Sequence, residues 1–244
     1  MGLPTIAVPE YTLTVPSSGK EVKYRPFLVK EEKILLIAME GEEQQQISNA
    51  TKRIVQNCVY GDIDVESMPA FDLEYIFLQL RGKSKGEVLD LKYKCPKCEG
   101  EIPLAVNLDD VKVIKHKDHT KKIQLTKDLG VVMKYPTLEL QQLAGEITEK
   151  KSSIEGLFET IIHCIDYIYD AENTYPSKDH TKKEMNDFLE SLPEKDFQQI
   201  AKFFETSPSL KHDVELKCSN KVKGKKECGY TEKLTLEGLG SFFD

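Results

Sequence analysis

Four cysteines in two widely separated pairs are the residues of this 244-residue chain best suited to chemistry. Cys95 and Cys98 form a C-x-x-C motif, and Cys218 and Cys228 follow near the end of the chain. A tight C-x-x-C turn presents two sulfur ligands, and four thiolates complete a tetrahedral Zn2+ site with no open coordination position. We therefore expect Cys95, Cys98, Cys218 and Cys228 to bind one structural zinc ion that joins distant parts of the chain.

The second cysteine pair is looser than the first, because nine residues separate Cys218 from Cys228. The intervening segment, Ser219–Glu227, is polar and rich in lysine, and it contains Gly224. Such a composition is typical of a surface loop. A loop here would leave the two sulfurs free to converge on one ion.

The sequence leaves two other roles for the cysteines to consider, a redox pair and a disulfide framework. A thioredoxin-like redox pair is expected at a helix N-terminus, whereas alternating strand patterns flank Cys95 and Cys98 on both sides. A disulfide framework is expected in a secreted scaffold, whereas no signal peptide is recognisable and six cysteines are sparse for this length. Cys58 and Cys164 lie in apolar helical patterns and are expected in the core.

Composition narrows the classes of function. A formal net charge of -7 disfavours a duplex-DNA binder, which usually carries a basic domain or stripe. Lysines do cluster locally, most densely across Lys221–Lys226, and such clusters are usually solvated. A zinc-ribbon protein acting on nucleic acid or in transcription is therefore the alternative function, and this loop is its best argument. No apolar run suggests a membrane span.

Periodicity divides the chain into segments. Proline-rich extended sequence and a turn at Ser17–Lys20 predict an N-terminal β-hairpin, and helical spacing then predicts three helices. Alternating apolar residues on both sides of each cysteine pair predict two hairpins that pair as a zinc-ribbon-like sheet. The expected organisation is a β-arm at 1–26, a helical region at 27–86, the zinc-ribbon-like unit at 87–112 and 208–244, and a helical insertion at 113–207. The fold class is α+β, mostly helical.

The insertion is expected to contain four helices. Their predicted ranges are Thr137–Ile147, Ile154–Tyr169, Thr181–Leu189 and Glu194–Phe204. Ser191 and Glu194 have the spacing of a capping box that would open the last helix.

Catalytic motifs are hard to find. His116 and His119 lie in a charged, loop-like run and are expected to be exposed, while His163 is expected to be packed or hydrogen-bonded in a helix. No phosphate-binding glycine loop, nucleophile elbow or H-E-x-x-H motif occurs. We predict no enzymatic activity and no catalytic residues.

Three stretches carry a resemblance to a known family. They are Tyr24–Leu36 (YRPFLVKEEKILL) with the helix that ends in Gln56–Cys58, Phe71–Glu87 (FDLEYIFLQLRGKSKGE) with the Cys95–Cys98 motif, and Leu234–Phe243 (LTLEGLGSFF). Together they resemble the T4-type bacteriophage baseplate hub family. The resemblance covers about half of the chain, from about residue 20 to 110 and from 208 to the end.

The resemblance implies a non-catalytic role in a contractile phage tail. The chain would be a hub subunit, or a factor that helps to assemble the hub with its tape-measure protein. Its implied partners are other hub and tape-measure proteins, and a homo-oligomer is compatible with the role. No membrane partner is expected, and the net charge disfavours nucleic acid. Its implied location is the tail baseplate of the virion, and the host cytoplasm during assembly.

Overall fold

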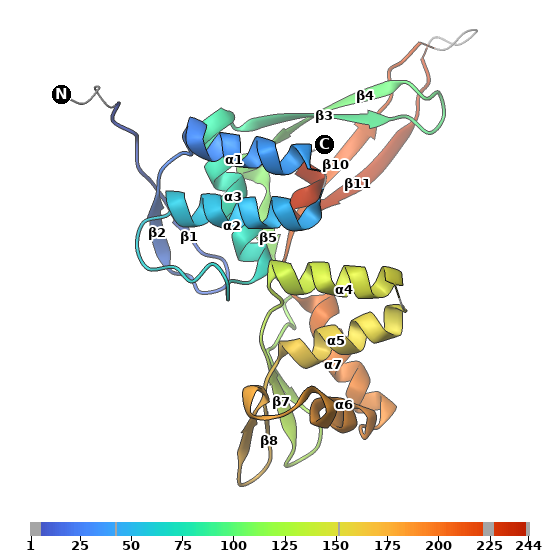
Figure 1. Cartoon of the computed structure of the whole chain (residues 1–244). Coiled ribbons are helices and arrows are strands. Elements are labelled where there is room, and N and C mark those ends of the chain that lie inside the picture. The colour runs from blue at the N-terminus through green and yellow to red at the C-terminus, as the bar shows by residue number, and fades with distance from the viewer. Residues whose placement is uncertain (1–5, 42, 151, 222–226, 243–244) are drawn as a thin grey trace, which may run out of the picture.

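A computed structural model describes residues 6–41, 43–150, 152–221 and 227–242 of the chain. These residues form a mixed α+β fold of seven α-helices and four small antiparallel sheets (Figure 1). The α+β class expected from the sequence is therefore confirmed. No helix among these residues combines the length and the apolar composition that a membrane span requires.

The N-terminal part contains one hairpin and three helices, as the periodicity predicts. Its elements are β1 (Tyr11–Thr14), β2 (Glu21–Tyr24), α1 (Val29–Glu40), α2 (Gln44–Cys58) and α3 (Ala70–Lys85). The hairpin turn places Gly19 in the left-handed region, at φ 69°, which glycine adopts without a steric penalty. Helix α3 runs through the centre of this part, with Ile76, Phe77 and Leu80 fully buried.

The C-terminus returns to the same core. After β11 (Thr231–Glu237), the short 3-10 helix η3 (Leu239–Phe242) inserts Phe242, which is 0% exposed, among the residues of α2 and α3. The Leu239 N–H donates a hydrogen bond to Glu74 Oε1 of α3 at 3.2 Å. The two ends of the described chain therefore share one hydrophobic core.

The two cysteine pairs lie at the tips of two long hairpins that project side by side from this core (Figure 1). The strands are β3 (Val88–Lys94) with β4 (Glu101–Asn107), and β10 (Ser209–Lys217) with β11. A short strand, β5 (Lys112–Ile114), extends the second hairpin to a three-stranded sheet. The predicted single zinc-ribbon-like sheet is wrong, because the two hairpins belong to separate sheets. They meet through side chains, including Ile102 and Leu216.

The segment between the hairpins is not wholly helical. Its elements are β6 (Lys122–Gln124), β7 (Gly130–Met133), α4 (Leu138–Lys150), α5 (Ser153–Cys164), β8 (Ile165–Tyr169), β9 (Thr174–Pro176), α6 (Lys182–Glu190) and α7 (Glu194–Thr206). The four strands form one sheet in the order β6-β7-β8-β9, and the sheet and the four helices contribute residues to a second hydrophobic core (Figure 1). The expectation of a helical insertion at 113–207 is thus only partly correct.

One predicted helix is divided. Helix α5 ends at Cys164, and the rest of the predicted range Ile154–Tyr169 is strand β8. Strand β8 is rich in β-branched and aromatic residues, which favour strands, and it pairs with both β7 and β9. Tertiary pairing therefore overrides the helical spacing that continues from α5.

The predicted capping box at Ser191 and Glu194 is also wrong. Ser191 is the C-terminal cap of α6, and α7 follows Pro193 without a side-chain cap. The capping box of this region lies instead at the start of α6, where the Thr181 hydroxyl accepts from the Glu184 N–H and the Glu184 carboxylate accepts from the Thr181 N–H. Pro193 at the N-cap sets the start of α7.

Polar contacts fasten the two cores to each other. Lys52 of α2 is only 5% exposed, and its ammonium group forms ion pairs of 2.6 Å with Glu66 and with Glu139 of α4. The Ala70 N–H at the start of α3 donates to the Pro136 carbonyl at 3.0 Å. These contacts join α2 and α3 to the segment that carries α4.

Candidate metal centre

Each cysteine pair lies in a turn that we call a knuckle. The first knuckle, residues 95–100, is a six-residue turn between β3 and β4. The Cys95 N–H donates to the Gly100 carbonyl at 2.9 Å, and the Glu99 N–H donates to the Cys95 carbonyl at 2.8 Å. Glu99 lies in the left-handed region at φ 60°, and it is the one non-glycine residue with a positive φ in the described chain. This backbone conformation turns the chain tightly enough to bring the Cys95 and Cys98 side chains to one side.

The second knuckle repeats these backbone contacts. The Cys218 N–H donates to the Tyr230 carbonyl at 2.8 Å, and the Gly229 N–H donates to the Cys218 carbonyl at 3.1 Å. Gly229, directly after Cys228, is left-handed at φ 65°, as Glu99 is directly after Cys98. The two knuckles are therefore equivalent despite their different spacing.

The extra residues of the second knuckle leave its geometry intact. The Cys228 N–H donates to the Asn220 carbonyl at 2.8 Å, which brings the two ends of the extra segment together. The extra residues of the second knuckle thus lie between Asn220 and Cys228. Residues 222–226, with Gly224 and most of the lysine cluster, lie outside the described residues, so the lysine argument for nucleic acid gains no structural support.

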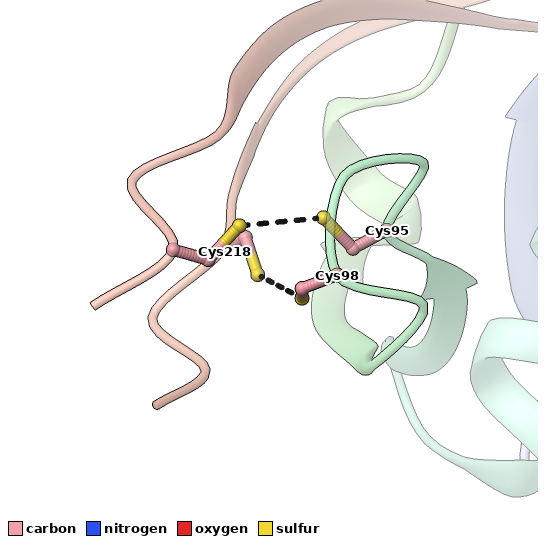
Figure 2. A group of neighbouring side chains, drawn as sticks. Cys95, Cys98 and Cys218 are labelled. Carbon is pink, nitrogen blue, oxygen red and sulfur yellow. Dashed lines mark hydrogen bonds between the residues drawn. The ribbon is translucent and has the colours of Figure 1, made fainter. Parts of the chain in front are cut away.

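The four sulfur atoms meet where the two knuckles face each other (Figure 2). They lie within 4.8 Å of one another, with Cys95 Sγ 3.8 Å from Cys228 Sγ and Cys98 Sγ 3.6 Å from Cys218 Sγ. Disulfide sulfurs are about 2 Å apart, so these separations are too long for disulfide bonds. A tetrahedral ion with metal–sulfur bonds of about 2.3 Å needs sulfurs about 3.8 Å apart, which the geometry fits.

Burial sets the environment of the cluster. Cys95, Cys218 and Cys228 are buried, with exposed fractions of 0%, 4% and 5%, and Cys98 is half-buried. The Lys97 ammonium group donates a hydrogen bond to the Cys228 carbonyl at 3.2 Å. This contact ties the first cysteine pair to the backbone of the second.

The thiol groups compete for protons. Burial raises the pKa of Cys95, but the backbone N–H groups of Lys97 and Cys98, together with hydrogen bonds from the Cys218 and Cys98 thiols, lower the pKa to about 7. Burial and the neighbouring thiols raise the pKa of Cys218 to about 12, although the backbone N–H of Asn220 lowers it. The first thiolate to form therefore opposes ionisation of the others, and a divalent cation would remove that repulsion.

The donor set suits a structural ion. Four thiolates in a tetrahedron favour Zn2+ or iron, and they saturate the ion, so that no position remains for water or substrate. This is the one cluster of potential metal ligands with at least three members in the described part of the chain. The chemistry available to it is cross-linking of the two hairpins.

The other two cysteines lie in the hydrophobic cores, as predicted. Cys58 and Cys164 are both 0% exposed. Burial raises the pKa of Cys58 to about 11 and that of Cys164 to about 12. Both thiols are therefore neutral at pH 7 and do not belong to the cluster.

One of the three histidines differs from its predicted setting. His116 is exposed as expected, but His119 is half-buried, with Nδ1 2.9 Å from Thr206 Oγ1 and Nε2 3.1 Å from the Tyr135 hydroxyl. His163 is exposed on α5 and is hydrogen-bonded to Glu159 at 3.0 Å, which agrees with the prediction that it is packed or hydrogen-bonded. None of these histidines lies in the sulfur cluster.

Comparisons with known proteins give one family and one curated relative. A family model described as T4 bacteriophage base plate protein matches residues 8–244. The chain is 25% identical over 236 residues to the baseplate hub assembly protein gp26 of Enterobacteria phage T4, covering 96% of this chain and 98% of that protein. No solved structure matches the chain.

Proposed function

The chain belongs to the family of T4 bacteriophage base plate proteins, and from this membership we propose that it helps to build the hub of a phage tail baseplate. It acts either as a hub subunit or as a hub-assembly factor. The observation that carries the proposal is the similarity to the baseplate hub assembly protein over nearly the whole length of both chains. Its locations are the tail of the virion and, during assembly, the host cytoplasm.

The proposed role is mechanical rather than catalytic. Hub and tape-measure proteins are the proposed partners, bound through protein–protein contacts. Helix α1 offers a suitable surface, because Val29, Leu36 and Ile37 are 81%, 50% and 56% exposed on it. Aliphatic side chains exposed together on one helix are typical of a surface that a partner covers.

We further propose that Cys95, Cys98, Cys218 and Cys228 hold one zinc ion. The proposal is supported by the sulfur separations, by the burial of three of the four ligands and by the equivalence of the two knuckles. The ion supplies a closed cross-link between hairpins that share no strand pairing. The two cysteine hairpins, called the cysteine arm below, would then keep one shape while partners bind.

The functional proposal is tested by measuring copy number. Quantitative mass spectrometry is applied to purified tails of the phage that encodes the chain, and to lysates of infected cells fractionated by size. A fixed ratio to hub proteins in finished tails identifies a hub subunit. Absence from tails, together with co-migration with hub or tape-measure protein in the lysate, identifies an assembly factor. Absence from both would contradict the proposed role.

A further inference from the structure

We propose that Asn220 is a positioning residue of the metal centre, which holds the Cys218 sulfur in place and ties the second knuckle to the first. The inference rests on the proposed metal site and adds to it a residue outside the four ligands. It follows from the contacts of one side chain. Asn220 is half-buried at the end of the second hairpin, two residues after Cys218.

The Asn220 amide nitrogen lies among three acceptors. Nδ2 is 2.9 Å from the Glu101 carbonyl oxygen, 3.3 Å from Cys218 Sγ and 3.9 Å from Cys98 Sγ. The amide NH2 group has two hydrogens. The two shorter contacts use them, so that one hydrogen points at the first hairpin and the other at the sulfur of the second.

These contacts fix the orientation of the amide. A carbonyl oxygen and a thiolate both accept hydrogen bonds, so the NH2 group, rather than the amide oxygen, must face them. The backbone carbonyl of Asn220 accepts the Cys228 N–H at 2.8 Å. A single residue therefore contacts the first hairpin and both cysteines of the second knuckle.

The expected effect acts through the ligand. An N–H group that donates to a coordinating thiolate orients the sulfur and stabilises its negative charge. Loss of such an outer contact typically weakens metal affinity about 10- to 100-fold. Asn220 itself contributes no atom to the ion.

Gly100 leaves the space that Asn220 occupies. A Cβ atom added at Gly100 would lie 2.5 Å from Asn220 Nδ2 and 3.0 Å from its Cγ. Gly100 is not among the glycines with positive φ, so the backbone conformation does not require glycine there. The role of Gly100 is thus to admit the Asn220 amide, and Gly100→Ala should displace that amide without touching a cysteine.

The test uses Co2+ as a spectroscopic probe in the full chain, with affinity measured by competition with a chelator under reducing conditions. We expect Asn220→Ala to weaken Co2+ binding about 10- to 100-fold and to shift the sulfur-to-cobalt charge-transfer band. The exposed neighbour Ser219 supplies the matched control, Ser219→Ala, which should change neither quantity. Gly100→Ala should reproduce the effect of Asn220→Ala, and the double variant should be no weaker than the single variants, because both remove one contact.

The outcomes separate the two proposals. Failure of the unmodified chain to bind Co2+ through sulfur would overturn the metal site itself. Normal binding by the unmodified chain, with Asn220→Ala equal to Ser219→Ala in affinity and spectrum, would overturn the role of Asn220 alone. Additive losses in the double variant would show that Gly100 acts independently of the amide.

Discussion

The cysteine arm, formed by β3, β4, β10 and β11, and the insertion at 113–207 differ in the size and composition of their buried clusters. The buried cluster between the two cysteine hairpins has five residues, three of which are cysteines. The insertion core, in contrast, has thirteen buried residues, of which Cys164 is the one cysteine. We expect apolar burial alone to stabilise the insertion, whereas the buried cluster at the tips of the cysteine hairpins is small and would depend on the proposed metal cross-link. We therefore predict that metal removal destabilises the cysteine arm, whereas loss of packed side chains destabilises the insertion.

The largest effect should follow metal removal. In small zinc sites, metal binding contributes on the order of 10 kcal/mol to folding. A strong chelator should therefore greatly speed amide hydrogen exchange in β3, β4, β10 and β11. Exchange in β7 and β8 should stay slow, because Val131, Met133 and Ile165 are fully buried there without help from the cluster.

A cysteine variant provides the matching genetic test. Cys95→Ser should loosen the same four strands and lower the melting temperature, while Cys58→Ala should retain the metal. An unchanged melting temperature in Cys95→Ser, or equal loosening of both regions by the chelator, would break the contrast between arm and insertion.

The reciprocal change is a cavity in the insertion. Ile161 of α5 is 0% exposed in the second core, and Ile161→Ala should cost about 2 to 5 kcal/mol of unfolding free energy. Hydrogen exchange should rise in α5, β7 and β8, and metal affinity should stay constant. The exposed residue Ile154 on the same helix, 67% exposed, gives the control Ile154→Ala with little loss. A large drop in metal affinity in Ile161→Ala would show that the regions are not separate.

The contact between α3 and the segment after β11, at the base of the cysteine arm, should become less stable as pH rises. Burial raises the pKa of Glu74 from 4.5 to about 7, although the Leu239 N–H lowers it. The folded state therefore binds more protons than the unfolded state between these values, and its stability falls as pH rises through about 7. At about 1.4 kcal/mol per unit, the full effect is about 3 kcal/mol. Glu74→Gln, measured by denaturant unfolding from pH 4 to 8, should remove this fall; an unchanged pH slope would contradict it.

The region around His119, near the start of the insertion, should show the opposite pH dependence of stability. This effect should be the smallest of those predicted. Burial, followed by the charges of Lys115, His116 and Lys121, lowers the pKa of His119 below its ordinary value of 6.5. The unfolded state then binds more protons, so stability falls as pH drops below about 6.5. His119→Gln should flatten this fall in denaturant unfolding. A variant that keeps the wild-type slope below pH 6.5 would assign the slope to other groups.

The sequence predicts local features better than it predicts which strands pair. The cysteine ligands and the helices before them follow from spacing, because a C-x-x-C turn and a helical face are local patterns. Strand β8 was missed since its pairing with β7 and β9 overrides the helical spacing carried over from α5. The separate sheets of the arm were missed because strand patterns do not specify which strands pair.

Other misses share this cause. His119 lies in a charged run, and its burial depends on Tyr135, Phe203 and Thr206, which the fold brings from elsewhere in the chain. One signal of the second knuckle was readable: Gly229 directly follows Cys228 and supplies the left-handed turn that Glu99 supplies in the first. Nothing in the spacing indicated Asn220, because its partners include Glu101 on the other hairpin.

The metal content of the purified full chain tests the central claim most directly. The chain is prepared under reducing conditions without added metal, and zinc and iron are quantified by mass spectrometry alongside a count of free thiols. We predict one zinc ion per chain, four thiols that react only after chelation or unfolding, and loss of the ion in Cys95→Ser. A folded chain with no bound metal and with reactive Cys95, Cys98, Cys218 and Cys228 would contradict the account.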